Sequence, residues 1–429
     1  MKTYPGRVLG FALLAGLAVS AIGCDDFLDV KNPNNLEAEA IDPESDARLL
    51  SQSVWQRFTS DFWGYSEQPL NVYVAWYTGS AWVGDTYPTR NDFGRRDVPW
   101  NNGHANSIWN YIHRNLNFAR TTVAAIEDAG NTVDLAQAHF VSAFSLLIQA
   151  ESFCEGTIAD HSVTPPEPRG PMSPVMLLDS AIVDFGNVKT VAQGVTGSDA
   201  ERASALATAA QVGIARAHLQ AGRRSEASAA AAQVPGDFEF LVWHMDDSSN
   251  RSLGNAVWAY SEARISLVTP PAFRAMADAG DPRIAYVDVG RVAQDGTLWF
   301  YRQDKYQGWG DHERIVSGLE ARYIKIEADQ DAAAMLAFIN ERRAVGNQGP
   351  LEPTSDMSVL MTELMDQKTR DFWLEGKRLA DFRRNPQFMS HIIPSGTDTY
   401  YKPDLGVVND ETCWPVHRSE YLNNPFFEM

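Results

Sequence analysis

Apolar residues recur at steps of three to four along several stretches of the chain, the spacing that places them on one face of an α-helix. The first stretch follows Asp42-Pro43, where aspartate can cap a helix and proline suits its first position. Three further groups predict helical pairs at about 108–153, 200–234 and 315–385. We therefore expect a mainly α-helical fold.

The segments between these groups lack a helical period and are rich in residues that break regular structure. We expect loops at 71–104, 161–174 and 394–429. In the region 235–312, short apolar runs alternate with Gly, Pro and Asp, which predicts loops, a few short strands and one short helix near Pro271–Ala279. The last helical group is expected to contain helices at Ile315–Ala328, Asp331–Ala344 and Ser358–Asn385.

Small residues mark one of the predicted helical pairs. Ala215, Gly222 and Ala227 have a spacing that loosely fits a tetratricopeptide repeat, in which small side chains let paired helices approach closely. The repeat is not regular along the chain. The expected scaffold is therefore tetratricopeptide-like, with long irregular loops.

The N-terminus carries the pattern of an export signal. Lys2 and Arg7 form a short basic region before an apolar run of about fifteen residues, from Val8 to Ile22, which is shorter than the roughly twenty that a membrane span requires. The run ends at Ala21-Ile22-Gly23-Cys24, which resembles a lipoprotein cleavage box. We predict lipid attachment at Cys24, and the alternative is an ordinary secretory cleavage that leaves this Cys free.

These signals divide the chain into three parts. The predicted signal peptide covers residues 1–23, and an Asp-, Asn- and Pro-rich tether with the lipid anchor covers 24–41. The remaining residues, 42–429, are expected to form a single domain.

The composition of the 429 residues is that of a globular protein, with 44% hydrophobic and 21% charged residues. The 55 acidic residues outnumber the 36 basic ones and give a net charge of −19. Loss of the signal peptide removes two positive charges and leaves about −21. Because such a surface repels phosphate groups, nucleic acid is not an expected partner.

Besides Cys24, the chain has two further cysteines, Cys154 and Cys413. Cys154 lies in an apolar helical pattern that favours a buried thiol. An exported protein can also form a disulfide, and sequence spacing does not decide whether these two residues pair.

The search for catalytic motifs finds no nucleophile elbow, no nucleotide-binding loop and no metal-ligand spacing, so we expect no cofactor and no metal. Asp371 and Glu375 are one helical turn apart and could suggest the paired carboxylates of a glycosidase. We favour a charge network on a helix surface that also includes Arg378.

Aromatic residues in the irregular regions are the stronger functional signal. One set comprises Trp76, Tyr77, Trp82, Tyr87 and Trp100, and the other comprises Trp299, Tyr301, Tyr306 and Trp309. Aromatic faces can stack on the C–H faces of sugar rings, while neighbouring amides and carboxylates bind hydroxyl groups. The alternative is that these rings pack in the core. The candidate ligand-binding residues are Trp76, Trp82, Trp100, Asn101, Trp299, Tyr301 and Trp309.

Several blocks in the same order resemble the SusD/RagB family of outer-membrane nutrient-binding lipoproteins. The start of the mature chain matches the family in Cys24-Asp25-Asp26-Phe27-Leu28-Asp29. Two helical blocks follow, Ile339-Asn340-Glu341-Arg342-Arg343 and the run Arg370–Arg384. The closing block is Trp414-Pro415-Val416 with Asn423-Asn424-Pro425. The run 370–384 is the most specific block and is expected to be architectural, its charges tying the helix to its neighbours.

The resemblance implies a binding protein and not an enzyme. Family members are anchored by lipid (palmitate among the acyl chains) to the outer membrane and face the outside of the cell. They act as lids on a SusC-type TonB-dependent transporter and deliver a nutrient, most often an oligosaccharide and sometimes a peptide. Two alternatives remain: a scaffold subunit that binds no nutrient, and a surface glycan hydrolase.

Overall fold

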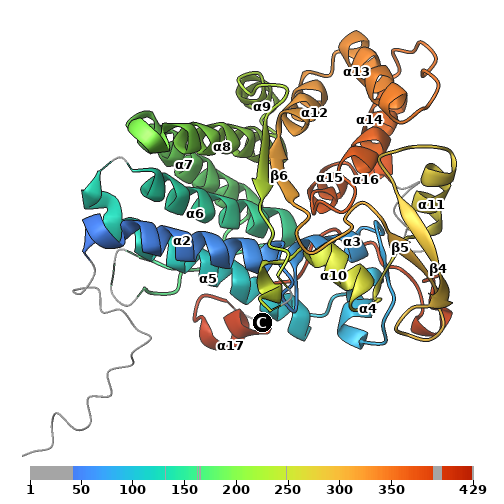
Figure 1. The fold of residues 1–429 in the computed structure, drawn as a ribbon, viewed down its shortest axis with the longest axis horizontal. Coiled ribbons are helices and arrows are strands. Elements are labelled where there is room, and N and C mark those ends of the chain that lie inside the picture. The colour runs from blue at the N-terminus through green and yellow to red at the C-terminus, as the bar shows by residue number, and fades with distance from the viewer. Residues whose placement is uncertain are drawn as a thin grey trace, which may run out of the picture. The chain divides into compact units, whose positions relative to one another are not determined.

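The structure is a computed structural model that describes residues 42–427 except 131, 162, 164, 165, 248 and 390–398. The predicted signal peptide (residues 1–23) and the whole predicted tether with Cys24 (residues 24–41) lie outside the described residues. The helical pattern of the first half of the sequence gives a row of helices, most of which pack on their sequence neighbours (Figure 1). The row consists of α2 (Pro43–Phe62), α5 (Gly103–Ile126), α6 (Val133–Ser152), α7 (Pro174–Gln193), α8 (Ala200–Gln220) and α9 (Arg224–Ala231).

Helix α6 lies at the centre of this row. It is buried at almost every position, because α5 and α7 pack against it and α2 and α8 also contact it. Among the described residues, it is the helix that is long and apolar enough to cross a bilayer, but 94% of its most apolar window is enclosed by protein. Its composition is therefore that of a core helix.

Side-chain caps define where three of these helices begin. Asn102 caps α5, Thr132 caps α6 and Ser173 caps α7, each accepting a hydrogen bond from a free backbone N–H group. The pairs predicted at 108–153 and 200–234 are confirmed as α5–α6 and α8–α9. Helix α7 was not predicted, although it too buries one apolar face against its neighbours.

The loop predicted at 71–104 is wrong in two places. Helix α3 (Leu70–Tyr77) is buried at all eight positions, and α4 (Pro88–Gly94) begins at a proline in its first turn. A helix buried on every side has no polar face, so its sequence shows no helical period.

The region 235–312, predicted as mixed, contains the short strands β2 (Glu239–Val242), β3 (Leu267–Val268), β4 (Tyr286–Val292) and β5 (Trp299–Gln303). They form antiparallel pairs, β4 with β5, β3 with β1 (Trp82–Val83) and β2 with β6 (Glu313–Ser317), the last two partners lying outside that region. The expected short helix is confirmed as α11 (Pro271–Asp278), and α10 (Ala256–Glu262) is an addition. Short 3-10 helices lie at η2 (Glu127–Ala129), η3 (Gly197–Asp199), η4 (Arg251–Leu253) and η5 (Pro403–Leu405).

The C-terminal part returns to helices. They are α12 (Gly318–Asp329), α13 (Ala332–Val345), α14 (Met357–Asp371), α15 (Arg378–Arg384), α16 (Pro386–Met389) and α17 (Arg418–Asn423). The helices expected at 315–328 and 331–344 are present, except that the first begins as strand β6. The prediction of a single helix at Ser358–Asn385 is wrong, because the helix is interrupted between the end of α14 and the start of α15.

Backbone conformation explains this break. Leu374 and Gly376 both have positive φ angles, of 63° and 73°. A side chain at Gly376 would also come within 3.3 Å of the backbone of Asn71 on α3. The turn therefore requires a glycine, and it directs its charged residues inward.

Two carboxylates at this turn are buried among cations. Asp371 accepts hydrogen bonds from Arg342 at 2.8 Å and from Arg283 at 3.1 Å. Glu375 accepts from Lys305 and Arg314 at 2.8 Å, and from Lys377 at 3.1 Å. The predicted charge network around Asp371 and Glu375 is confirmed. The prediction that it lies on a helix surface is wrong, because both carboxylates are buried.

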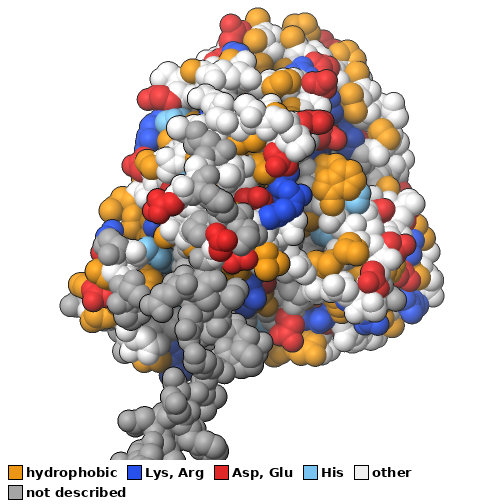
Figure 2. All heavy atoms as spheres, turned by 60° about the vertical axis from the view of Figure 1, so that its left-hand side comes forward, with side chains coloured by type: hydrophobic (Ala, Val, Ile, Leu, Met, Phe, Trp, Pro, Cys, Tyr) orange, Lys and Arg blue, Asp and Glu red, His pale blue; other side chains and the backbone are white. Residues whose placement is uncertain are grey.

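The network extends into the helical row. Lys377 also pairs with Glu320 at 3.1 Å, and Arg216 of α8 bridges Glu320 at 3.3 Å and Glu151 of α6 at 2.6 Å. Other charges lie on the surface, where Figure 2 shows acidic and basic side chains interspersed with small hydrophobic patches on one face. Buried charges require partners, so this chain of ion pairs fixes the C-terminal helices against the row.

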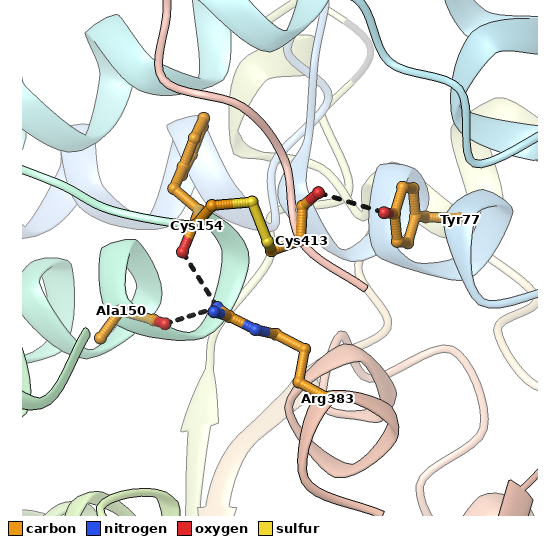
Figure 3. The surroundings of a disulfide bond; sticks show 6 residues. Tyr77, Ala150, Cys154, Arg383 and Cys413 are labelled. Carbon is orange, nitrogen blue, oxygen red and sulfur yellow. Dashed lines mark hydrogen bonds between the residues drawn. A yellow bond between two sulfur atoms is a disulfide. The ribbon is translucent and has the colours of Figure 1, made fainter. Parts of the chain in front are cut away.

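A disulfide joins the end of α6 to the C-terminal segment (Figure 3). Cys154 and Cys413 are bonded, with their Cα atoms 5.1 Å apart. Arg383 donates to the carbonyl of Ala150 at 2.7 Å, and Tyr77 donates to the carbonyl of Cys413 at 3.2 Å. The favoured interpretation of Cys154 as a buried thiol is therefore wrong.

We expect Glu375→Gln to lower the free energy of unfolding by about 3 kcal/mol or more, because it leaves buried cations without their partner. Glu341→Gln is the matched control, since Glu341 pairs with Arg322 but its side chain is 46% exposed. That control should cost less than about 1 kcal/mol. Urea unfolding at neutral pH measures both.

The effect of Glu375→Gln should depend on pH. Although burial favours the protonated acid, Lys305, Lys377 and Arg314 hold the pKa of Glu375 well below its ordinary value of 4.5. A lowered folded-state pKa stabilises the protein above the unfolded-state pKa, and this contribution is lost as the pH falls. The difference between wild type and variant should therefore be constant above about pH 5 and shrink below it. Equal losses in the two variants, or a difference that grows in acid, would contradict the buried network.

Reduction of the disulfide should lower the free energy of unfolding by about 2–4 kcal/mol, because the bond closes a long loop of the unfolded chain. The measurement is urea unfolding with and without reductant. In the double variant Cys154→Ala/Cys413→Ala the reductant should have no effect. If Cys154 and Cys413 both react with a thiol reagent in the unreduced, urea-unfolded protein, the bond is absent. Any thiol of Cys24 is counted separately.

Candidate ligand-binding site

The structure separates the seven predicted ligand-binding residues into different places. Trp76 is only 1% exposed and lies inside α3, where its ring packs against Tyr73 and Tyr260. The prediction that Trp76 contacts ligand is therefore wrong for this structure, because every position of α3 is buried.

Trp82 lies on β1 and belongs to a stack of two rings that a third ring contacts at a tilt of 43°. Its ring stacks on Tyr401 with centroids 4.2 Å apart and an angle of 14°, and Tyr400 lies on Tyr401 at 4.1 Å. The hydroxyls of the two tyrosines are 2.7 Å apart, and that of Tyr400 is 3.1 Å from the side-chain oxygen of Asn91. The stack joins the segment before α4 to the C-terminal segment.

Beside this stack is a cleft of about 510 Å³, which we call the loop cleft. Three segments far apart in sequence form it: the start of α4, the turn between β4 and β5, and the segment around η5. Its lining residues are Asp85, Thr86, Asn91, Asp295, Thr297, Leu298, Tyr401, Lys402, Pro403, Asp404 and Leu405. The lining combines polar and charged side chains with apolar ones, as in sites for small polar molecules.

Most charges in the loop cleft are already paired. Asp85 bonds the buried Arg90 at 2.6 Å, and Lys402 lies 3.0 Å from Asp295. Although burial opposes its charge, Asp295 has a lowered pKa because backbone N–H groups and Lys402 donate to it. Burial also raises the pKa of Tyr401 well above its ordinary value, so its phenol stays neutral. The cleft therefore suits a neutral ligand rich in hydroxyl groups.

Tyr87 adds an exposed ring next to this cleft. It directly follows the lining residue Thr86 and is 50% exposed, with the guanidinium of Arg90 lying 4.6 Å from its ring centroid. Because Arg90 also bonds Asp85, the ring is held by a buried ion pair. Tyr87 is thus a platform on which a sugar ring can stack.

Trp299 and Tyr301 lie on the same face of strand β5. Trp299 is 46% exposed and donates to Asp288 at 2.8 Å, and Arg274 lies 3.6 Å from the centroid of Tyr301. The intervening Phe300 points into the core. The two predicted residues therefore share an exposed ribbon face, but neither lines the loop cleft.

The remaining predicted residues lie elsewhere. Trp309 packs in a half-buried cluster with Tyr65 and Trp258 at centroid distances of 5.3 and 4.8 Å. Trp100 is 42% exposed and contacts Arg418 near α17, and Asn101 beside it is exposed. The set predicted from the sequence does not form one site.

Sequence reasoning missed two contributors to the loop cleft. Tyr401 and Lys402 lie in the segment that was assigned as irregular without function. The adjacent Tyr400-Tyr401-Lys402 was the available signal, since consecutive tyrosines in an irregular segment need packing partners. Tyr87 was noticed within its aromatic set but was not selected.

Within the described ranges, no group of His, Cys, Asp and Glu residues has the arrangement of a metal site. The two carboxylates considered as a hydrolytic pair, Asp371 and Glu375, are each held by several cations. Their surroundings are those of a structural ion network.

No protein-family model matches the chain, and no curated protein matches it in sequence. Solved structures do match its fold. A SusD/RagB family protein from Bacteroides thetaiotaomicron is 14% identical and has a TM-score of 0.62, covering 89% of this chain and 94% of its own. A SusD-like carbohydrate-binding protein from Bacteroides fragilis is 13% identical with a TM-score of 0.64, covering 90% and 99%.

A third similar structure is surface glycan-binding protein A from Bacteroides thetaiotaomicron. It is 12% identical, with a TM-score of 0.66, and the match covers 89% of this chain and 98% of that protein. The same protein has also been solved in complex with laminarihexaose. A tetratricopeptide-like helical scaffold with irregular loops defines the SusD-like class of folds, and this chain has that fold. The resemblance to the SusD/RagB family and the predicted fold class are thereby confirmed at the level of structure.

The free energy of unfolding distinguishes a tryptophan buried in the core from one exposed on the surface. Trp76→Ala should lower the free energy of unfolding by about 3–5 kcal/mol, because it leaves a large cavity in the core. Trp299→Ala on the exposed ribbon face is the matched control, and it should change the free energy of unfolding by less than about 1 kcal/mol. Urea unfolding measures both variants. A small effect of Trp76→Ala would mean that this ring is not enclosed and would return it to the candidate site.

Proposed function

We propose that this protein binds a neutral oligosaccharide at the loop cleft and is a nutrient-binding member of the SusD/RagB family. The observation that carries the proposal is the cleft itself, in which aromatic and paired polar groups face a space of about 510 Å³. Its charges are largely neutralised by one another, so a ligand with many hydroxyl groups fits it better than an ion.

The similar structures support the same ligand class. Their names describe a SusD-like carbohydrate-binding protein and a surface glycan-binding protein, the latter also in complex with laminarihexaose. At 12–13% identity, this likeness concerns the fold, and the residues that contact ligand here are argued from this chain alone.

We further propose how the protein is placed in the cell. Residues 1–23 direct export, Cys24 carries the lipid, residues 24–41 form a tether, and 42–429 form one ligand-binding domain on the outer membrane, facing outward. The ligand passes to a SusC-type TonB-dependent transporter, over which the domain acts as a lid. The chain supplies binding and positioning, and no bond in the ligand is broken by it.

The loop cleft can be tested with two variants of exposed residues. Tyr87→Ala removes the stacking platform, and Thr297→Trp fills the cleft. Each should weaken binding at that site at least about tenfold, which corresponds to about 1.4 kcal/mol. The measurement is calorimetric titration of the exported form, residues 24–429 in detergent, with neutral hexasaccharides of β-1,3-, β-1,4- and α-1,4-linked glucose.

Tyr421→Ala is the matched control, since Tyr421 lies on α17 and does not line the cleft. It should leave the affinity unchanged. Unaltered binding by both cleft variants would exclude the loop cleft as a site. Free glucose or shorter products in the titration mixture would instead favour a glycan hydrolase, and transporter binding without any sugar affinity would favour a scaffold subunit.

A further inference from the structure

The most exposed large hydrophobic side chain of the described residues lies outside the loop cleft. Trp243 directly follows β2, and its side chain is 73% exposed. Its ring contacts that of His312 with centroids 4.2 Å apart. His312 is itself held in place, because its ring nitrogen accepts a hydrogen bond from the backbone N–H of His244 at 3.2 Å. The tryptophan is thus presented on a supported surface.

Trp243 is part of the wall of a cleft of about 620 Å³, which we call the Trp243 groove. Phe240 of strand β2 and Trp243 directly after it form one side, and Trp55 of α2 adds a third aromatic ring. The other side combines polar residues near the starts of α6 and α8, among them Gln137 and Arg202, with the apolar Ala205 and Leu206 of α8. Aromatic rings therefore face hydrogen-bonding groups across the groove, the arrangement that suits a sugar ring.

A second cleft of about 620 Å³ is lined in part by residues of the same ribbon. Glu239 and Leu241 of β2 line both clefts, while Trp243 lines the first and His312 the second. Because these two rings are in contact, they form a bridge between the clefts. An extended ligand can follow this path from one cleft to the other, over the pair of rings.

The charges along this path favour a neutral ligand. In the groove, Arg202 lies 3.6 Å from Asp134, and the acidic Asp199, Glu201 and Glu239 are also present. In the second cleft, the cations pair with carboxylates: Arg283 and Arg342 with Asp371, and Lys305 and Arg314 with Glu375. An anionic polymer would find its cations already occupied, whereas hydroxyl groups can use the remaining hydrogen-bonding positions.

We propose that the Trp243 groove is a second binding site for a neutral oligosaccharide, separate from the loop cleft, with Trp243 as its stacking platform. Its lining residues and those of the loop cleft do not overlap. In Figure 1, β6 of this ribbon lies between α8 and α12, whereas α4 and β4 are in the lower right of the view. The proposal shares only the ligand class with the proposed function.

Two sites on one chain change how long ligands bind. A polysaccharide that reaches both sites binds the second as an intramolecular event, so its affinity exceeds that for a short oligosaccharide. The protein would then retain long chains more strongly than the fragments released from them.

The test labels the protein with 5-fluorotryptophan and follows its ¹⁹F resonances during titration with the three neutral glucose hexasaccharides named above. The Trp243 resonance is assigned by its absence in Trp243→Phe. We expect this resonance to shift saturably with at least one sugar, and Trp243→Ala to weaken that binding at least tenfold. Calorimetry should show two sites in the wild type and one in Trp243→Ala. Because Trp243 is exposed, its removal should leave the unfolding transition unchanged.

Thr297→Trp separates the outcomes for the two sites. If the Trp243 resonance still shifts in this variant, the groove binds independently, whatever happens at the loop cleft. If Trp243 does not respond to any of the three sugars, the second site is excluded, even when binding sensitive to Thr297→Trp persists. Trp299→Ala, the control for an exposed tryptophan elsewhere, should not change the Trp243 response.

Discussion

Buried charges at the turn between α14 and α15 hold the C-terminal helices against the row of helices formed by the first half of the chain. Glu375 lies among Lys305, Arg314 and Lys377, which come from the segment after β5, from β6 and from the turn itself. Removing any one of these groups from water is costly, so the folded state must supply all the partners at once. The ion network therefore fixes the turn in one position, and the elements that contribute the partners are fixed with it.

The same turn positions the loops that form the loop cleft. Trp373 donates through its indole to the carbonyl of Ser80 at 3.0 Å, and Arg378 donates to the Ser80 hydroxyl at 2.8 Å. Ser80 directly precedes the β1 region, where Trp82 stacks on Tyr401. The disulfide at Cys413 restrains the C-terminal segment from the other side. A cleft formed by three distant segments thus rests on a buried charged turn and a covalent cross-link.

Much of the fold was predictable, because an amphipathic helix repeats its apolar residues visibly. The pairs α5–α6 and α8–α9 were predicted on that basis, whereas α3 was missed because it is buried on all sides. The break after Asp371 was missed because inward-facing charges in the sequence look like those of an exposed helix. The candidate site was less predictable. Trp76 and Tyr87 both lie in an aromatic-rich segment, and the sequence does not show which of the two rings is buried. Tertiary packing buries Trp76 and leaves Tyr87 exposed.

The measurement that best decides this account is a calorimetric titration of the exported form with neutral glucose hexasaccharides, followed by analysis of the sugar for cleavage products. The account predicts saturable binding, with the hexasaccharide recovered intact. Absence of binding to every sugar in the panel, or recovery of shorter products, would contradict it.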